Sequence, residues 1–179
     1  MNQRGAWLAV LMSLFVAAFG FSTSYAQELA IWQGKWVKLA EKVSALRVSE
    51  SGSISPVNYK GTIYMHIATV DDTTKVLHCQ YYEYNDGGLN FNGDIDLRIS
   101  AGSSTEFSWW TLVGPEFPTI ISGQVAGRIK GKVKNGALAS AAVTTVGGAL
   151  YVTMDDVPTV AGISWKGSLV PESKVPPVR

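Results

Sequence analysis

The clearest pattern in the chain is a strict alternation of apolar and polar residues over positions 89–99. Such alternation is typical of a β-strand with one buried and one wet face. Further segments rich in Val, Ile, Thr, Tyr and Trp follow, separated by turn residues such as Asp, Asn, Gly and Pro. The pattern predicts strands over residues 31–49, 59–70, 75–84, 89–99, 105–113, 119–134, 137–146, 149–154 and 160–170. Residues 38–43 also fit a short helix, and the pattern leaves this alternative open.

Two short hairpin loops allow the pairing of three strands to be predicted. If residues 85–88 form one loop, Tyr82 lies opposite Phe91 and His78 opposite Ile95. If residues 71–74 form the other, Met65 lies opposite Gln80. The interior face is then lined by Ile63, Met65, His78, Gln80, Tyr82, Phe91 and Ile95. The prediction depends on both loops, because a slip of one residue turns every side chain of a strand to the opposite face.

Strands this numerous, joined by short turns, must hide their edges by closing on themselves or by packing two sheets. We expect an all-β fold, an antiparallel up-and-down β-barrel of about eight strands, with a β-sandwich as the alternative. Glycines within the strand patterns favour the barrel, because they suit strongly coiled strands and close backbone approaches: Gly93, Gly123, Gly127, Gly131 and Gly167.

The two ends of the chain differ from this pattern. Residues 1–26 combine a short leader containing Arg4, an apolar stretch and small residues up to Ala26, which is typical of a secretory signal peptide. Residues 27–170 are expected to form the barrel domain, and the proline-rich residues 171–179 an extended, poorly ordered tail. The sequence therefore predicts an exported protein, periplasmic or extracellular after cleavage.

Composition and charge narrow the function. Without the leader, 14 acidic residues balance the remaining basic ones, which argues against a nucleic-acid partner. His66, His78 and the single cysteine, Cys79, do not have the spacing of a metal site, and no catalytic or cofactor motif is present. Carboxylate pairs fall on turns or on a wet strand face, which do not supply the burial or the charged neighbour that a catalytic acid needs. We expect neither a metal, a cofactor nor catalytic residues.

Two surface features are candidates for interaction. Cationic residues occupy every second position of one predicted strand and so share one face: Arg128, Lys130, Lys132 and Lys134. This face either contacts an anionic membrane or polysaccharide, or is simply a solvated or edge-protecting strand. Trp109 and Trp110 are adjacent, so one faces the interior and the other solvent; the pattern does not decide which.

Gly34, Lys35 and Trp36 resemble the G-x-W motif of the lipocalins, secreted barrels that hold small apolar ligands. The resemblance implies that Trp36 closes the barrel floor with Lys166 as its cation-π partner. The chain lacks that family's second motif, its C-terminal helix and its cysteine pair.

From these observations we expect a binding protein rather than an enzyme, with a small, mainly apolar ligand inside the barrel. One alternative is an envelope or surface interaction protein that uses the cationic strand face and exposed aromatic residues. A second alternative is a barrel isomerase or cyclase that uses His78 and a tyrosine. The sequence does not define an oligomeric state.

Overall fold

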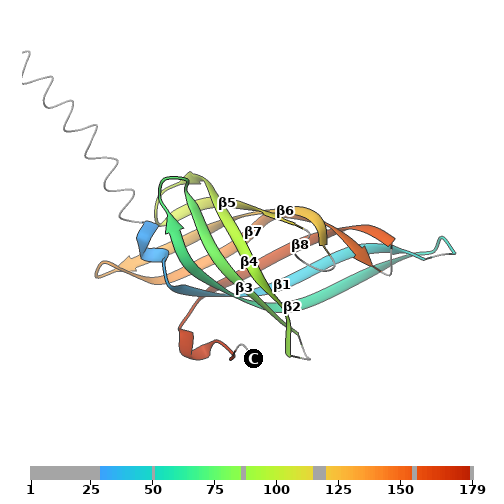
Figure 1. The fold of residues 1–179 in the computed structure, drawn as a ribbon, viewed down its shortest axis with the longest axis horizontal. Helices are drawn as coiled ribbons and strands as arrows, with labels where there is room; N and C mark the ends of the chain where they lie inside the picture. Colours follow the sequence, from blue (N-terminus) through green and yellow to red (C-terminus); the bar gives the residue numbers. More distant parts are fainter. Residues whose placement is uncertain (1–28, 50, 86–87, 115–119, 155–156, 178–179) are drawn as a thin grey trace, which may run out of the picture.

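The structure is a computed structural model that describes residues 29–49, 51–85, 88–114, 120–154 and 157–177. Eight strands form one closed antiparallel barrel in chain order, in which β8 pairs with β1 (Figure 1). The strands are β1 (Lys35–Val48), β2 (Ile54–Asp71), β3 (Val76–Asn85), β4 (Gly88–Gly102), β5 (Glu106–Val113), β6 (Ile120–Lys134), β7 (Ala137–Met154) and β8 (Val157–Val170). The predicted up-and-down barrel is confirmed, and the sandwich alternative is wrong.

Three segments differ from the predicted strands. Residues 38–43 lie within β1 rather than in a helix. The expected turn at Gly147 and Gly148 is absent, because β7 runs through both glycines. The pairing of β7 shifts by one residue near this point, both with β6 and with β8. Residues 171–177, expected to be extended, contain a short 3-10 helix, η2 (Glu172–Lys174). The predicted leader, residues 1–26, lies outside the described residues.

Two bulges set the orientation of β3. The β2–β3 loop comprises residues 72–75 rather than 71–74, because the Asp71 carboxylate accepts hydrogen bonds from the backbone amides of Thr73 and Thr74. Ala68 is then an extra residue between the pairs Ile67–Cys79 and Thr69–His78. Asn90 is a second extra residue, between Glu83–Phe91 and Tyr84–Leu89. Each hairpin is thereby displaced by one residue from the predicted register, and the predicted inward face of β3 is reversed.

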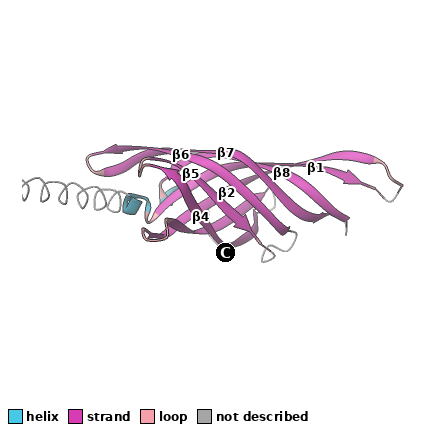
Figure 2. Cartoon of the chain, turned by 90° about the horizontal axis from the view of Figure 1, so that it is seen from above, coloured by secondary structure: helices cyan, strands magenta, loops and turns pink. Residues whose placement is uncertain are grey.

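One end of the barrel, which we call the floor, is closed by the 3-10 helix η1 (Ala30–Trp32), drawn in blue in Figure 1 and in cyan in Figure 2. The Trp32 side chain is fully buried, packs edge-on against Phe107 at 5.3 Å between ring centroids, and donates a hydrogen bond from Nε1 to the Ser104 carbonyl. A Cβ at Gly131 would lie 2.9 Å from the Trp32 ring. Glycine is therefore required at position 131 for the tryptophan to fit.

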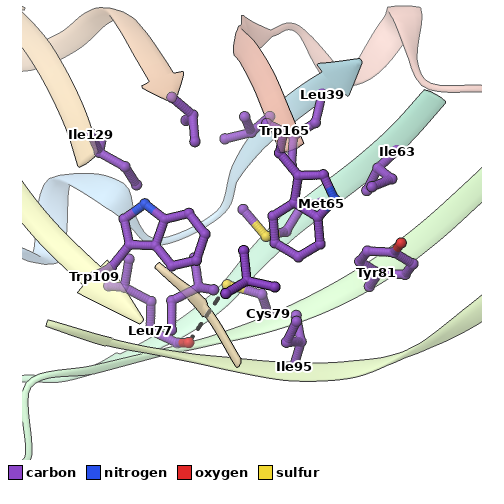
Figure 3. Close-up of a cluster of buried hydrophobic side chains, with 14 of the residues drawn as sticks. Leu39, Ile63, Met65, Leu77, Cys79, Tyr81, Ile95, Trp109, Ile129 and Trp165 are labelled. Atoms are coloured by element: carbon purple, nitrogen blue, oxygen red, sulfur yellow. Dashed lines mark hydrogen bonds between the residues drawn. The ribbon is translucent and has the colours of Figure 1, made fainter. Parts of the chain in front are cut away.

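The interior between the floor and the middle of the barrel is densely packed. Figure 3 shows buried side chains from β1 to β6 and from β8 that meet in the interior, among them Met65, Cys79, Trp109 and Trp165. The Trp109 and Trp165 rings stack at 5.9 Å, and a Cβ at Gly127 would lie 2.6 Å from the Trp109 ring. Side chains of the described residues therefore fill this part of the interior.

Candidate functional site

A cavity of about 560 Å³ occupies the opposite half of the barrel, whose end we call the mouth. Its walls are mainly aliphatic and aromatic side chains, with a few polar groups toward one side. The lining residues are Glu41, Val43, Val57, Tyr59, Tyr81, Glu83, Asn90, Phe91, Ile95, Val113, Ile120, Leu150, Val152, Thr153, Ile163 and Trp165. The volume lies within the usual range for small-molecule sites.

Glu41 is the most deeply placed charged group of the cavity. It occupies an inward position of β1, between Leu39 and Val43, and its side chain is only 4% exposed. Trp165 of β8 donates a hydrogen bond from Nε1 to Glu41 Oε1 at 2.8 Å. Burial away from water raises the pKa of the Glu41 carboxyl to about 7; the hydrogen bond from Trp165 opposes this shift and the negative charge of Glu83 adds to it.

Glu83 of β3 is held by donors from three strands. Tyr59 of β2 donates its hydroxyl hydrogen to Glu83 Oε1, and Asn90 of β4 donates from Nδ2 to the same oxygen at 3.0 Å. Tyr81 donates to Glu83 Oε2 at 3.3 Å, and also interacts with Glu41. We call Glu41, Tyr59, Tyr81, Glu83, Asn90 and Trp165 the polar cluster. It links the two carboxyl groups through Tyr81.

The local backbone makes this cluster fit. A Cβ at Gly61, the β2 residue paired with Glu41, would lie 3.0 Å from the Tyr59 hydroxyl and 3.3 Å from Glu41 Oε2. Glycine at this position therefore leaves space for both groups. The bulge at Asn90 places that side chain on the cavity wall, although a regular strand would direct Asn90 and Phe91 to opposite faces.

Aromatic rings flank the polar cluster. The Tyr81 ring lies 6.1 Å from Trp165 and 6.2 Å from Phe91 between centroids. Burial is the main cause that raises the pKa of the Tyr81 hydroxyl, and the carboxylates of Glu41 and Glu83 raise it further. The hydroxyl is therefore neutral over the physiological range and serves as a hydrogen-bond donor.

The seven predicted lining residues separate into three groups. Phe91 and Ile95 line the cavity. Ile63 and Met65 face inward but belong to the packed core toward the floor. His78, Gln80 and Tyr82 face outward, so their predicted inward orientation is wrong: the His78 side chain is 48% exposed and its Nδ1 lies 2.7 Å from Asp96 Oδ1. The bulges at Ala68 and Asn90 explain the reversal.

The roles implied by the G-x-W motif are also wrong. Trp36 follows Gly34 and Lys35 but lies on the outer face, where its ring stacks on His66 at 4.5 Å. Lys166 pairs with Ala40, four residues along β1 from Trp36, so the two side chains do not form the implied cation-π pair. Trp32 closes the floor instead. Gly34 has a positive φ of 73° and forms the turn from η1 into β1.

The surface candidates lie on the outer face of the barrel. The cationic stripe, defined as Arg128, Lys130, Lys132 and Lys134, is exposed along the floor half of β6. At Arg128 and Lys130, β6 pairs with both β5 and β7, so this part of the stripe does not lie on a free edge. Lys132 and Lys134 lie beyond the last residue that pairs with β5, and there β6 pairs with β7. Lys130 forms an exposed ion pair with Glu106 at 2.9 Å. Trp109 faces inward, and Trp110 faces outward below the guanidinium of Arg98 at 5.6 Å.

The thiol and imidazole groups are separated. Cys79 is buried in the core, where burial raises its pKa, while His66 lies outside the barrel beside Trp36. Among the described residues no group of three His, Cys, Asp or Glu side chains is placed to hold a metal ion. No helix in the described part of the chain is long and apolar enough to cross a membrane.

The sequence interpretation missed all six residues of the polar cluster, and among them Glu41 is the one that could have been found. Its signal was present, because Val37, Leu39, Glu41, Val43 and Ala45 alternate with polar or small residues as one face of a strand. A carboxyl group on such a face is expected to be buried.

The fold and the cavity define an eight-stranded up-and-down barrel with a one-ended internal pocket. Comparison of the chain with protein families, with curated proteins and with solved structures finds no match.

Proposed function

We propose that the protein binds a small, mainly apolar ligand inside the mouth half of the barrel. The observation that supports this proposal is the cavity of about 560 Å³ beside a densely packed floor in the same barrel. A cavity lined by Val, Ile and Leu side chains costs stability, since each lost contact removes dispersion attraction, and a bound ligand restores such contacts. Burial of a ligand's apolar surface in that space is favourable.

The polar cluster would determine the orientation of a ligand in the cavity. A mainly apolar pocket with a few polar groups on one side fixes which end of a ligand faces which wall. Since Glu41, Tyr81 and Trp165 lie deeper than Val57 and Thr153, we expect the polar end of the ligand to lie toward the floor. The ligand's apolar part then contacts the aliphatic residues near the mouth.

A matched pair of variants on β5 tests the proposal. Val113 lines the cavity, whereas the adjacent Leu112 is 65% exposed on the outer face. Val113→Trp places an indole in the cavity, and Leu112→Trp places the same group in solvent. N-phenyl-1-naphthylamine, a neutral dye whose emission rises in apolar surroundings, serves as the probe.

We expect saturable dye binding by the wild type and Leu112→Trp, and a loss of at least about tenfold in affinity for Val113→Trp. Circular dichroism and urea unfolding establish that both variants fold. His78→Ala, on the outer face, is expected to bind as the wild type does. Equal affinity of the two β5 variants, or no saturable binding by the wild type, would contradict the proposal.

The cationic stripe supports a second candidate function, contact with an anionic membrane or polysaccharide. Four cationic side chains on one outer face sum to a positive potential that attracts such surfaces. The barrel requires none of them for its core, since all four point to solvent. The leader predicted over residues 1–26 supports export to a compartment where such surfaces occur.

A further inference from the structure

The charged groups that line the cavity are all acidic, which restricts the charge of its ligand. Two of the lining residues, Glu41 and Glu83, carry carboxyl groups, and none of the lining residues is Lys, Arg or His. Elsewhere in the described residues, a carboxylate on the outer face does meet a cation, as Glu106 does with Lys130. The interior carboxyl groups have no such partner in the described part of the chain.

Glu41 has hydrogen-bond donors but no opposite charge. The Trp165 indole is a neutral donor, and so is the Tyr81 hydroxyl. Neutral donors stabilise a buried carboxylate less than an ion pair does, and a charge taken out of water is costly unless it is paired. The cavity therefore contains a carboxyl group that is 4% exposed and whose ionised form has no countercharge among the lining residues.

The aromatic rings around the carboxyl groups suit a cation as well. Tyr81, Phe91 and Trp165 all line the cavity. The centroid of the Tyr81 ring lies 6.2 Å from that of Phe91 and 6.1 Å from that of Trp165. The faces of aromatic rings carry partial negative charge and attract ammonium groups. Carboxylates beside aromatic faces provide both the charge and the apolar surroundings that an alkylammonium head group requires.

We propose that the ligand is an amphipathic amine, whose ammonium group binds beside Glu41 at the deep end of the cavity while its apolar part contacts the aliphatic walls. This inference rests on the proposed function and adds the chemical class of the ligand. An anionic head group, such as that of a fatty acid, is repelled by both glutamates.

Binding of an amine is then linked to the ionisation of Glu41. The polar or titratable groups that line the cavity with Glu41 in the described structure are Tyr59 from β2, Tyr81 and Glu83 from β3, Asn90 from β4, Thr153 from β7 and Trp165 from β8; the lining residues of β5, β6 and β7 are uncharged. None of these groups is cationic, so nothing within the lining substitutes for the ligand's charge. As the pH rises from 5 to 8, Glu41 loses its proton and the site gains affinity for an ammonium ion.

Three probes of equal length separate charge from apolar contact: 4-phenylbutylamine, 4-phenylbutan-1-ol and 4-phenylbutanoate. They are titrated into the full chain by isothermal calorimetry at pH 5 and pH 8, where the amine stays protonated because aliphatic amines have pKa values of about 10. Glu41→Gln removes the ionisable group while it retains an oxygen that can accept from Trp165. Glu106→Gln, the same substitution on the outer face, is the matched control.

At pH 8 we expect the amine to bind at least about tenfold more tightly than the alcohol, and the carboxylate to bind most weakly. This preference is expected to fall to about threefold or less in Glu41→Gln and to persist in Glu106→Gln. The amine's affinity should rise by at least about tenfold from pH 5 to pH 8, while that of the alcohol should not rise.

The results distinguish this inference from the function on which it rests. If the alcohol binds saturably and the amine has no advantage, or if the advantage survives in Glu41→Gln, the amine inference is wrong and the apolar pocket remains. If none of the three probes binds, both are wrong. The thermal stability of Glu41→Gln, measured alongside, establishes that the variant is folded.

Discussion

At the floor, the large side chains of Trp32, Phe107 and Trp109 fill the interior of the barrel. At the mouth, most inward-facing residues are the smaller Val, Ile and Leu, and they surround a cavity. Both halves follow one alternation of inward and outward residues along the same eight strands. The difference lies in side-chain volume and in the plug supplied by η1. A barrel can thus place its stability in one half and leave the other half free for a ligand.

Removal of the floor plug is expected to have the largest effect. Trp32→Ala deletes a fully buried indole and its hydrogen bond to Ser104, and such substitutions cost about 3–5 kcal/mol of unfolding free energy. Trp36→Ala is the control, because that ring stacks on His66 outside the barrel. Urea unfolding measures both. A cost for Trp32→Ala no greater than that for Trp36→Ala would show that the floor is not the more tightly packed end.

Ionisation of Glu41 is expected to make the mouth half sensitive to pH. The carboxyl has a pKa of about 7 when folded and about 4.5 when unfolded, so the folded state holds the extra proton between these values. The contribution of Glu41 to the unfolding free energy is then greatest below about pH 4.5 and falls by about 3 kcal/mol as the pH rises through 7.

Glu41→Gln does not titrate, so its unfolding free energy relative to the wild type should increase by about that amount between pH 4.5 and pH 8. Urea unfolding at the two pH values measures the change, with Glu106→Gln as the exposed control. A difference between Glu41→Gln and the wild type that stays constant with pH would mean that Glu41 is ionised in the folded protein throughout.

Substitution of glycine by alanine is expected to have an intermediate effect on stability, which depends on how tightly the site is packed. A Cβ at Gly127 would lie 2.6 Å from the Trp109 ring, whereas a Cβ at Gly147 meets nothing within 4 Å. Gly127→Ala is therefore expected to cost about 1–3 kcal/mol by overpacking, and Gly147→Ala to be nearly neutral. Thermal unfolding of the two variants tests this. Equal unfolding midpoints for the two variants would indicate that the packing around Trp109 accommodates an added methyl group as readily as the exposed position 147 does.

The outer face is expected to give the smallest effect. The cationic stripe runs along the floor half of β6, and attraction to an anionic surface contributes about 1 kcal/mol per cationic residue near it. A variant combining Lys130→Glu and Lys132→Glu should therefore bind phosphatidylserine vesicles more weakly than the wild type at low salt. A variant combining Lys42→Glu on β1 with Lys166→Glu on β8 changes the net charge by the same amount at other exposed positions and is the control. Equal retention of all three proteins would exclude the stripe as a membrane contact.

Much of the fold could be predicted from the sequence because alternation and turn residues are local signals. The strand at residues 89–99 and the closure of about eight strands followed from them. The orientation of β3 did not, since it depends on Ala68 and Asn90, and an extra residue in a strand leaves no local mark in the pattern. The alternation within β3 itself, with Leu77, Cys79 and Tyr81 on one face, was a better guide than the hairpin loops.

The candidate site was predicted only in part for a related reason. Phe91 and Ile95 were found from the alternation of β4, but Glu41 lies in a segment whose pattern also fitted a helix. Tyr59, Tyr81 and Glu83 come together only when β1, β2 and β3 are side by side in the observed register. The polar cluster is a property of the closed sheet and of no single strand.

The closed floor makes the barrel a blind tube with a single route for exchange. A ligand longer than the tube is wide cannot turn around inside it, so the end that goes in first is the end that is held. The water it displaces must leave past it through the same opening. Exchange is therefore expected to slow as the chain of the ligand lengthens, even where the head group, and its contact with Glu41, stays the same.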